Sequence, residues 1–277
     1  MTSTVLVAAD APGRPWLTSD QVMRIAVGVY LTLFFLYMFL PLVYMMLVTF
    51  NDSRIPTLTP WKGYTLRWFL EMWADERMWN SVVKSFIIGF WVIVLSVPLG
   101  LAGAMFMTRM RVPGQSFVYA VLVSPVLMPG IIIGLSTLVF WDTQFRIGGR
   151  WQLSVLGQTS FIAAYCMLIF MARLTRFDRT LEEAALDLGA TEWQAFREVT
   201  LPALAPGIAA AALLAFTISF DDYVITSLVA GVDSETLPMV IYAMARRGAN
   251  PVVNAVSTLI VVALGTLILI SEKLREA

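Results

Sequence analysis

Long apolar runs without a charged side chain divide the chain into regular segments. A helix of about 20 apolar residues is long enough to cross the hydrocarbon core of a bilayer. Runs of this length lie at residues 25–51, 85–108, 112–141, 151–172, 199–220 and 248–271. A buried helix of a soluble protein could account for one such run. Six in series predict an all-α integral membrane protein with six transmembrane helices and both termini on the same side.

Two further segments complete the predicted organisation. Residues 1–21 are polar and lack the short apolar core and small-residue cleavage site of a signal peptide. We interpret them as a tail that precedes a transmembrane domain over residues 22–277. The apolar stretch within residues 236–247 is too short to cross a bilayer. We expect a re-entrant or interfacial segment there.

Composition narrows the possible functions. Hydrophobic residues make up 58% and charged residues 14% of the 277, and 19 basic residues balance 19 acidic ones. Such a chain offers no basic surface for a nucleic acid. It has no histidine and one cysteine, Cys166, which argues against histidine-dependent catalysis and zinc sites. Since it also lacks a G-x-x-x-x-G-K-S/T sequence, we expect a protein without catalytic activity that binds no cofactor or metal itself.

The polar segment 173–198 is expected to contain two short amphipathic helices. Residues 180–183 (TLEE) and 191–194 (TEWQ) each fit a capping box, in which an N-cap threonine and a Glu or Gln three residues later satisfy free backbone N–H groups. Gly189 follows the first helix as a C-terminal stop. The apolar stripes of these helices predict either a face that docks a partner protein or a helix pair that lies on lipid.

The same segment carries a longer motif. It reads EAA-x-x-x-G at residues 183–189, followed by nine residues and then V-x-L-P at residues 199–202. This pattern resembles the EAA motif of bacterial ABC importer permeases, with Val199 where that family prefers isoleucine. The resemblance covers most of the chain. Within the family, the chain is similar to permeases of the spermidine/putrescine (polyamine) type, especially to the second permease of each pair. The other matching segments are residues 124–135, 214–225 and 236–239.

The resemblance implies a type I ABC importer permease fold with six transmembrane helices and a cytoplasmic coupling helix in the loop 173–200. The implied partners are membrane lipid, a second and different permease, two copies of an ATPase subunit that uses ATP and Mg²⁺, and a periplasmic or lipid-anchored substrate-binding protein. The resemblance also implies that the protein lies in the bacterial inner membrane with both termini in the cytoplasm. The distribution of basic residues barely decides this orientation, because their numbers on the two sides of the membrane are nearly equal. The implied ATPase-coupling residues are Glu182, Glu183, Ala184, Ala185, Asp187, Gly189, Ala190 and Trp193.

A candidate substrate pathway lies near the end of the fifth apolar run. Two adjacent carboxylates follow this run, and ionisable groups within a membrane are costly and usually functional or paired. They could attract a cationic polyamine, cap a helix break, or bind Arg246 or Arg247. Two prolines four residues apart weaken the third run, which predicts either a pore-lining break or a simple packing kink. The candidate pathway residues are Asp221, Asp222, Tyr223, Pro125, Met128, Pro129 and Ser219.

Together these features predict a permease subunit of an ATP-driven importer that translocates putrescine or spermidine delivered by a binding protein. The same machinery could carry another small solute, such as an amino-acid derivative, an aminophosphonate or ferric iron. An ion-coupled secondary transporter is the less favoured alternative, because the sequence shows no convincing inverted repeat and only one charged pair among its apolar runs.

Overall fold

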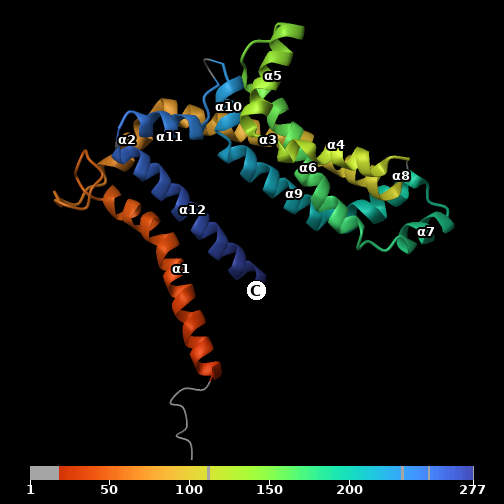
Figure 1. Ribbon diagram of the computed structural model, residues 1–277, viewed down its shortest axis with the longest axis horizontal. Helices are drawn as coiled ribbons and strands as arrows, with labels where there is room; N and C mark the ends of the chain where they lie inside the picture. Colours follow the sequence, from red (N-terminus) through yellow and green to blue (C-terminus); the bar gives the residue numbers. More distant parts are fainter. Residues whose placement is uncertain (1–18, 111–112, 232–233, 249, 277) are drawn as a thin grey trace, which may run out of the picture. The chain divides into compact units, whose positions relative to one another are not determined.

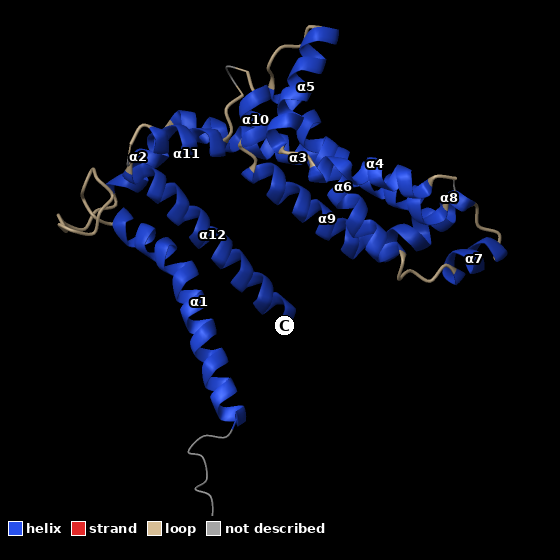
Figure 2. Ribbon diagram, in the orientation of Figure 1, coloured by secondary structure: helices blue, strands red, loops and turns tan. Residues whose placement is uncertain are grey.

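The structure is a computed structural model that describes residues 19–110, 113–231, 234–248 and 250–276. These residues form helices joined by loops (Figure 2), which confirms the predicted all-α class. The chain divides into two compact units, one formed by residues 1–68 with 254–277 and the other by residues 69–253. All the predicted site residues lie in the second unit.

The first unit contains α1 (Ser19–Thr49) and all but the first three residues of α12 (Pro251–Glu276). The two helices meet where the buried hydroxyl oxygens of Thr49 and Thr258 lie 3.1 Å apart. The loop after α1 is fixed by the indole N–H of Trp68, which donates to the carbonyl of Asn51 at 2.9 Å. Most of α1 exposes apolar side chains around its whole circumference, as a helix that faces lipid does.

The other helices belong to the second unit, apart from the first two residues of α2 (Figure 1). They are α2 (Arg67–Ala74), α3 (Glu76–Arg109), α4 (Gln115–Leu127), α5 (Gly130–Phe145), α6 (Trp151–Leu174), α7 (Thr180–Asp187), α8 (Glu192–Ala195), the π-helical turn η1 (Phe196–Thr200), α9 (Leu201–Asp221), α10 (Val224–Val229) and α11 (Leu237–Arg246). The elements α8, η1 and α9 follow one another without a break. The second short helix predicted for the polar loop is therefore the first part of a continuous helix over residues 192–221.

Helices α3, α6 and α9 pack against one another and form the core of the second unit (Figure 1). Val92, Ile162 and Phe170 are completely buried there. The backbones of α3 and α6 approach closely at Gly100, where a Cβ atom would lie 2.5 Å from the Cβ of Cys166. Small residues allow such close contacts between membrane helices, and no larger side chain fits at this position without displacing α6.

Four helices in the described part of the chain are long and apolar enough to cross a membrane, namely α1, α3, α6 and the helix over residues 192–221. The pair α4–α5 adds a fifth span if it is counted as one. The sixth predicted helix corresponds to α12, whose residues 251–263 form a shorter apolar helix. Four or five spans are thus present, and six remain a prediction.

The third predicted span is divided into α4 and α5, which are bent by 101° at residues 128–129. Pro129 has no N–H to donate, and a residue that precedes proline is driven into an extended backbone. Met128 accordingly has φ −80° and ψ 136°. The sequence predicted a weakened span, and the structure has a complete break between two short helices.

The helix α3 begins at Glu76 and not at residue 85, where its apolar run begins. Asp75 caps this earlier start, since its carboxylate accepts a hydrogen bond from the backbone N–H of Met78 at 3.2 Å. A charge-free run marks only the part of a helix that fits the hydrocarbon core, and a polar first turn extends beyond it. In the region of the predicted re-entrant or interfacial segment, the structure has the ten-residue helix α11, and its place relative to the membrane remains a prediction.

Candidate functional site

The start of α7 differs from the sequence prediction. Thr180 is the first residue of the helix and not its N-cap. The carboxylate of Asp178 accepts hydrogen bonds from the backbone N–H of Thr180 at 3.0 Å and from its hydroxyl at 2.8 Å. These hydrogen bonds hold the pKa of the Asp178 carboxyl below its ordinary value. The predicted capping box over residues 180–183 is therefore wrong, and the carboxylate of Glu183 is not used to begin the helix.

The end of α7 and the start of α8 agree with the sequence prediction. Gly189 has a φ of +93°, a backbone conformation that glycine adopts readily. Its own N–H and that of Ala190 donate to carbonyls of the preceding turn at 2.9 and 3.0 Å, the hydrogen-bond pattern of a Schellman cap. The capping box of Thr191 and Gln194 is present in both directions. Gly189 therefore ends one helix, and Thr191 starts the next.

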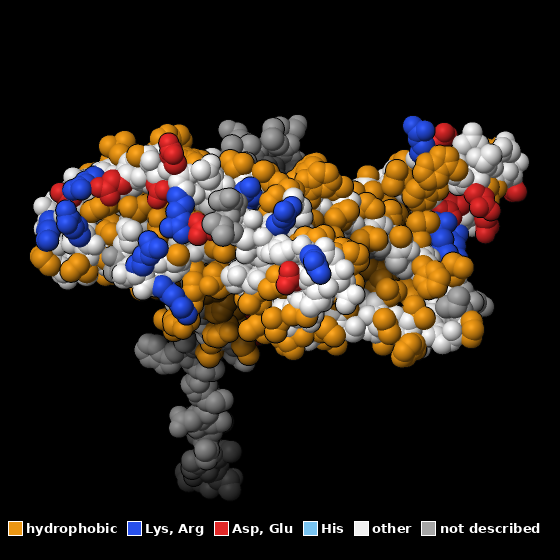
Figure 3. All heavy atoms as spheres, turned by 90° about the horizontal axis from the view of Figure 1, so that it is seen from above, with side chains coloured by type: hydrophobic (Ala, Val, Ile, Leu, Met, Phe, Trp, Pro, Cys, Tyr) orange, Lys and Arg blue, Asp and Glu red, His pale blue; other side chains and the backbone are white. Residues whose placement is uncertain are grey.

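One side of α7 and the first turn of α8 present apolar and acidic side chains to the outside. Leu188 is 90% exposed and Trp193 is 66% exposed. Glu183 and Asp187 are exposed and form no hydrogen bond or ion pair with the described residues. In Figure 3 this end of the second unit, at the right, shows acidic and basic side chains close together beside an apolar region. Of the other predicted coupling residues, Ala184 is exposed, and Ala185 and Ala190 are half-buried.

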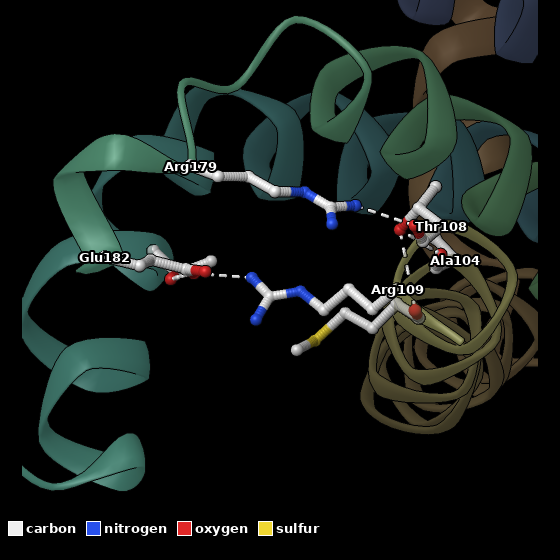
Figure 4. A network of polar contacts seen from close by, with 7 residues as sticks. Ala104, Thr108, Arg109, Arg179 and Glu182 are labelled. Atoms are coloured by element: carbon white, nitrogen blue, oxygen red, sulfur yellow. Dashed lines mark hydrogen bonds and ion pairs between the residues drawn. The ribbon is translucent and has the colours of Figure 1, made fainter. Parts of the chain in front are cut away.

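Glu182 does not belong to this outer surface. Its side chain is 14% exposed, and its carboxylate accepts hydrogen bonds from the guanidinium of Arg109 at 2.5 Å and from the hydroxyl of Thr200. Arg179 donates to the backbone carbonyl of Thr108 at 2.7 Å. Figure 4 shows that the two arginines cross the space between α7 and the end of α3 in opposite directions. These contacts could not be predicted from the sequence, because they join positions more than 70 residues apart and follow no local spacing.

The second candidate site lies at the break between α9 and α10, where Asp222 caps α10. Its carboxylate accepts hydrogen bonds from the backbone N–H of Thr226 at 2.9 Å and from the Thr226 hydroxyl at 2.8 Å. The buried side-chain amide of Gln158 on α6 donates to the same carboxylate at 3.1 Å. Ser219 donates in turn to the side-chain oxygen of Gln158 at 2.5 Å. Asp222 is thus held inside a polar network that fixes the helix break.

Asp221, the last residue of α9, has different surroundings. It is exposed and forms no hydrogen bond or ion pair with the described residues. Arg246, one of its predicted partners, instead donates to the hydroxyl of Tyr242 at 3.1 Å and lies over that ring at 4.9 Å. The ring of Tyr223 packs against Tyr242 with centroids 4.4 Å apart. Asp221 is therefore an unpaired carboxylate two residues from an aromatic pair.

The two helix breaks are neighbours. A Cβ atom on Gly130, the first residue of α5, would lie 3.5 Å from the Cγ1 of Val224, the first residue of α10. Residues 125–129 lead into one break, and residues 219–223 form the other. The contact between α5 and α10 therefore brings the two halves of the predicted pathway together.

Comparison with known proteins identifies the family. Residues 96–274 match the family described as binding-protein-dependent transport system inner membrane component. The chain belongs to this family. Putrescine transport system permease protein PotI of Escherichia coli (strain K12) is 36% identical over 243 residues, which cover 86% of each chain. Spermidine/putrescine transport system permease protein PotC of Haemophilus influenzae is 30% identical over 236 residues, which cover 85% of the present chain and 91% of PotC.

The permease is therefore an inner-membrane subunit of a binding-protein-dependent ABC importer. Membership in this family excludes the alternative of an ion-coupled secondary transporter. ATP hydrolysis belongs to a separate subunit of such importers. The fold agrees with this assignment. The crystal structure of a bacterial ABC transporter involved in the import of the acidic polysaccharide alginate contains a chain that matches with a TM-score of 0.70 at 16% identity, covering 95% of the permease and 99% of that chain.

Proposed function

We propose that the permease translocates a polyamine such as putrescine or spermidine, which a binding protein delivers. The observation that carries the proposal is the 36% identity to a putrescine permease over 86% of both chains. A second polyamine permease is 30% identical over a similar length. The exposed carboxylate of Asp221 and the tyrosine pair close to it are the chemical feature of this chain that suits such a cargo.

Asp221 is the residue we assign to the cationic cargo. A carboxylate attracts an ammonium group, and an unpaired charge within a transmembrane region is costly unless it has a function. The neighbouring pair of Tyr223 and Tyr242 offers ring faces that favour cations. Broken helices commonly line transport pathways, and the breaks at residues 128–129 and 222–223 adjoin through α5 and α10. Asp222 would then shape the pathway without contacting the cargo.

We further propose that the outward side of α7 docks in a groove of the ATPase subunit. Glu183, Ala184 and Asp187 would meet the groove along the helix, and Gly189 would allow the chain to turn sharply behind it. The exposed Trp193 would contact the ATPase at the edge of this surface. Closure of two ATPases after ATP binding would move the paired α7 helices together and switch the permeases by rigid-body rotation.

The proposed complex contains a second, different permease, two ATPase subunits that use ATP and Mg²⁺, and a periplasmic or lipid-anchored binding protein. This chain would bind no cofactor itself. Six spans, including the α4–α5 pair and α12, would place both termini in the cytoplasm together with the loop of residues 173–200.

The cargo is tested by ATP hydrolysis of the complete complex in lipid nanodiscs with its binding protein. Putrescine, spermidine, an aminophosphonate and ferric iron are added separately. The proposal requires that a polyamine stimulates hydrolysis most. Stimulation by only one of the other solutes would retain the ABC importer and reject the polyamine assignment.

The docking surface is tested by charge reversal. Glu183→Lys should release the ATPase during purification of the complex, because the reversed charge meets the groove directly. Glu198→Lys is the matched control, since Glu198 is an exposed carboxylate on η1 without a partner in the described chain. Equal amounts of bound ATPase in both variants would show that α7 is not the docking element.

A further inference from the structure

Two reciprocal contacts join α7 to the end of α3, and we name them the α3–α7 bridge. The guanidinium of Arg109, on α3, donates to Glu182 of α7 at 2.5 Å. The guanidinium of Arg179, the N-cap residue of α7, donates to the carbonyl of Thr108 on α3 at 2.7 Å. Figure 4 shows both contacts side by side. Each helix thus contributes one arginine and one acceptor.

The placement of these groups favours a strong connection. Glu182 lies in the first turn of α7, and Arg109 lies in the last turn of α3, so each charge suits the dipole of its own helix. The carbonyl of Thr108 is among the last four of α3, which have no partner within the helix. The side chains of Arg109 and Glu182 are only 30% and 14% exposed, so water and salt screen this pair less than a surface pair.

The bridge also reaches the helix that follows. The same carboxylate oxygen of Glu182 accepts a hydrogen bond from Thr200, a completely buried residue at the end of η1. Residue 201 begins α9, which packs with α3 and α6 in the core. Glu182 therefore connects α7 to α3 and to the base of α9 at one point.

Apolar packing adds little to the connection between α7 and α3. No residue of α7 is buried, and Leu181, Leu186 and Leu188 are all exposed. Polypeptide links at residues 175–179 and 188–191 join α7 to α6 and α8. Without the bridge, α7 would still pack against η1 and α8, but it could shift relative to α3.

We infer that the α3–α7 bridge transmits movement of the docked α7 to α3 and α9, an inference that rests on the proposed docking of α7. Glu182 and Arg109 are positioning residues in this role. The two adjacent carboxylates then have different roles, because Glu183 faces the ATPase and Glu182 faces the membrane helices. Loss of the bridge should leave the ATPase bound and hydrolysing ATP while fewer cargo molecules cross per ATP.

The test uses the complete complex in proteoliposomes with its binding protein and radiolabelled putrescine. Glu182→Gln and Arg109→Gln should each raise the ATP hydrolysed per putrescine transported by about tenfold, within the usual range of coupling between sites. The amount of bound ATPase should match the wild type. Exchange of the two charges, Arg109→Glu with Glu182→Arg, should restore part of the coupling, because the ion pair returns while the contact of Glu182 with Thr200 and the favourable helix dipoles do not. A purely steric role would allow no recovery. Glu198→Gln is the control that removes an unpaired carboxylate nearby.

Four results separate the inference from the proposals on which it rests. Normal coupling in Glu182→Gln and Arg109→Gln would overturn the transmission role. Loss of bound ATPase in Glu182→Gln would also overturn it, because Glu182 would then contact the ATPase directly. Retention of ATPase in Glu183→Lys would instead reject the docking of α7. If the wild type transports another solute of the panel in place of putrescine, the cargo assignment fails and the coupling ratio is measured with that solute.

Discussion

The chain has two pairs of adjacent carboxylates, at residues 182–183 and 221–222, and the two pairs are built differently. In each pair one carboxylate is held by internal contacts, and the other is exposed with no partner among the described residues. Glu182 is held by the cation of Arg109. Asp222 is held by uncharged donors, which are the amide of Gln158 and the hydroxyl and backbone N–H of Thr226.

The difference follows from what each inward carboxylate connects. Glu182 joins separate helices at the end of the unit, where an arginine gives a strong, charge-assisted hydrogen bond. Asp222 closes a break inside a helix, where neutral donors satisfy it without adding a charge to an apolar region. Glu182 and Glu183 are adjacent on a helix and therefore point about 100° apart. Asp222 follows the end of α9 in an extended backbone, so it too faces a different side from its neighbour. One role should not be assigned to both members of such a pair.

The largest expected effect comes from removing the inward carboxylate of the second pair. Asp222→Ala takes away the acceptor of Thr226 and one acceptor of the buried Gln158. Buried donors left without partners cost about 1–3 kcal/mol each, so we expect a lower melting temperature and poor recovery of the complex. Tryptophan fluorescence of the detergent-solubilised complex measures the melting temperature.

The matched variant is Asp221→Ala, which removes the exposed carboxylate next to it. A surface change of this kind alters stability by about 0.5 kcal/mol or less. The two melting curves should therefore differ clearly, and coincident curves would contradict the division of roles within the pair.

A second, smaller effect is expected from changing Gln158, an uncharged member of the same network. Gln158→Leu keeps the volume of a completely buried side chain and removes its amide. Asp222 would retain Thr226, while Ser219 would lose its acceptor on Gln158. We expect a loss of about 1–2 kcal/mol, measured in the same way. A loss as large as that of Asp222→Ala would mean that Gln158, and not the capping of α10, holds the break.

The sequence predicts well the features that depend on local chemistry. The apolar runs locate α6 and α9 to within two residues at each end, and the glycine and capping rules locate Gly189 and Thr191 correctly. Composition alone could not show that the third run breaks completely at Pro129, because the depth of a bend depends on the helices packed beside it. The capping box at residues 180–183 failed because Asp178, two residues earlier, competes for the same N–H group.

The division of roles within the acidic pairs could not be read from the sequence. Glu182 and Glu183 are equivalent in local pattern, and only the folded chain places Arg109 and Thr200 beside one of them. The same holds for Asp222, whose partner Gln158 lies 64 positions away on α6. Charge and spacing can nominate a pair, but long-range packing decides which member is available to a ligand.

A third effect should appear in transport and not in stability. Asp221→Asn keeps the size of the exposed side chain and removes its charge. If the carboxylate attracts an ammonium group of the cargo, the KM for putrescine uptake should rise about tenfold, the equivalent of about 1.4 kcal/mol. The melting temperature should stay unchanged. An unaltered KM would place the cargo elsewhere in the pathway.

The smallest effect concerns another arginine–carboxylate pair, which tests whether burial gives the α3–α7 bridge its strength. Arg77 binds Glu235 through two hydrogen bonds of 2.6 and 2.7 Å, but its side chain is 43% exposed and that of Glu235 is 37% exposed. Such surface pairs contribute about 0–1 kcal/mol, so Glu235→Gln should shift the melting temperature less than Glu182→Gln does. Equal shifts in the two variants would show that burial does not strengthen the pair of Arg109 and Glu182.

The pH dependence of the melting temperature shows whether the exposed pair of Arg77 and Glu235 stabilises the folded protein. The hydrogen bonds and the positive charge of Arg77 lower the pKa of Glu235. A carboxyl with a lowered pKa in the folded state stabilises the protein fully above its ordinary pKa and loses that contribution as the pH falls through the lowered value. The difference in melting temperature between the wild type and Glu235→Gln should thus stay constant from about pH 7 to pH 5 and shrink below about pH 4. A difference that grows on acidification would mean that the neutral carboxyl binds Arg77 better, which contradicts an ion pair.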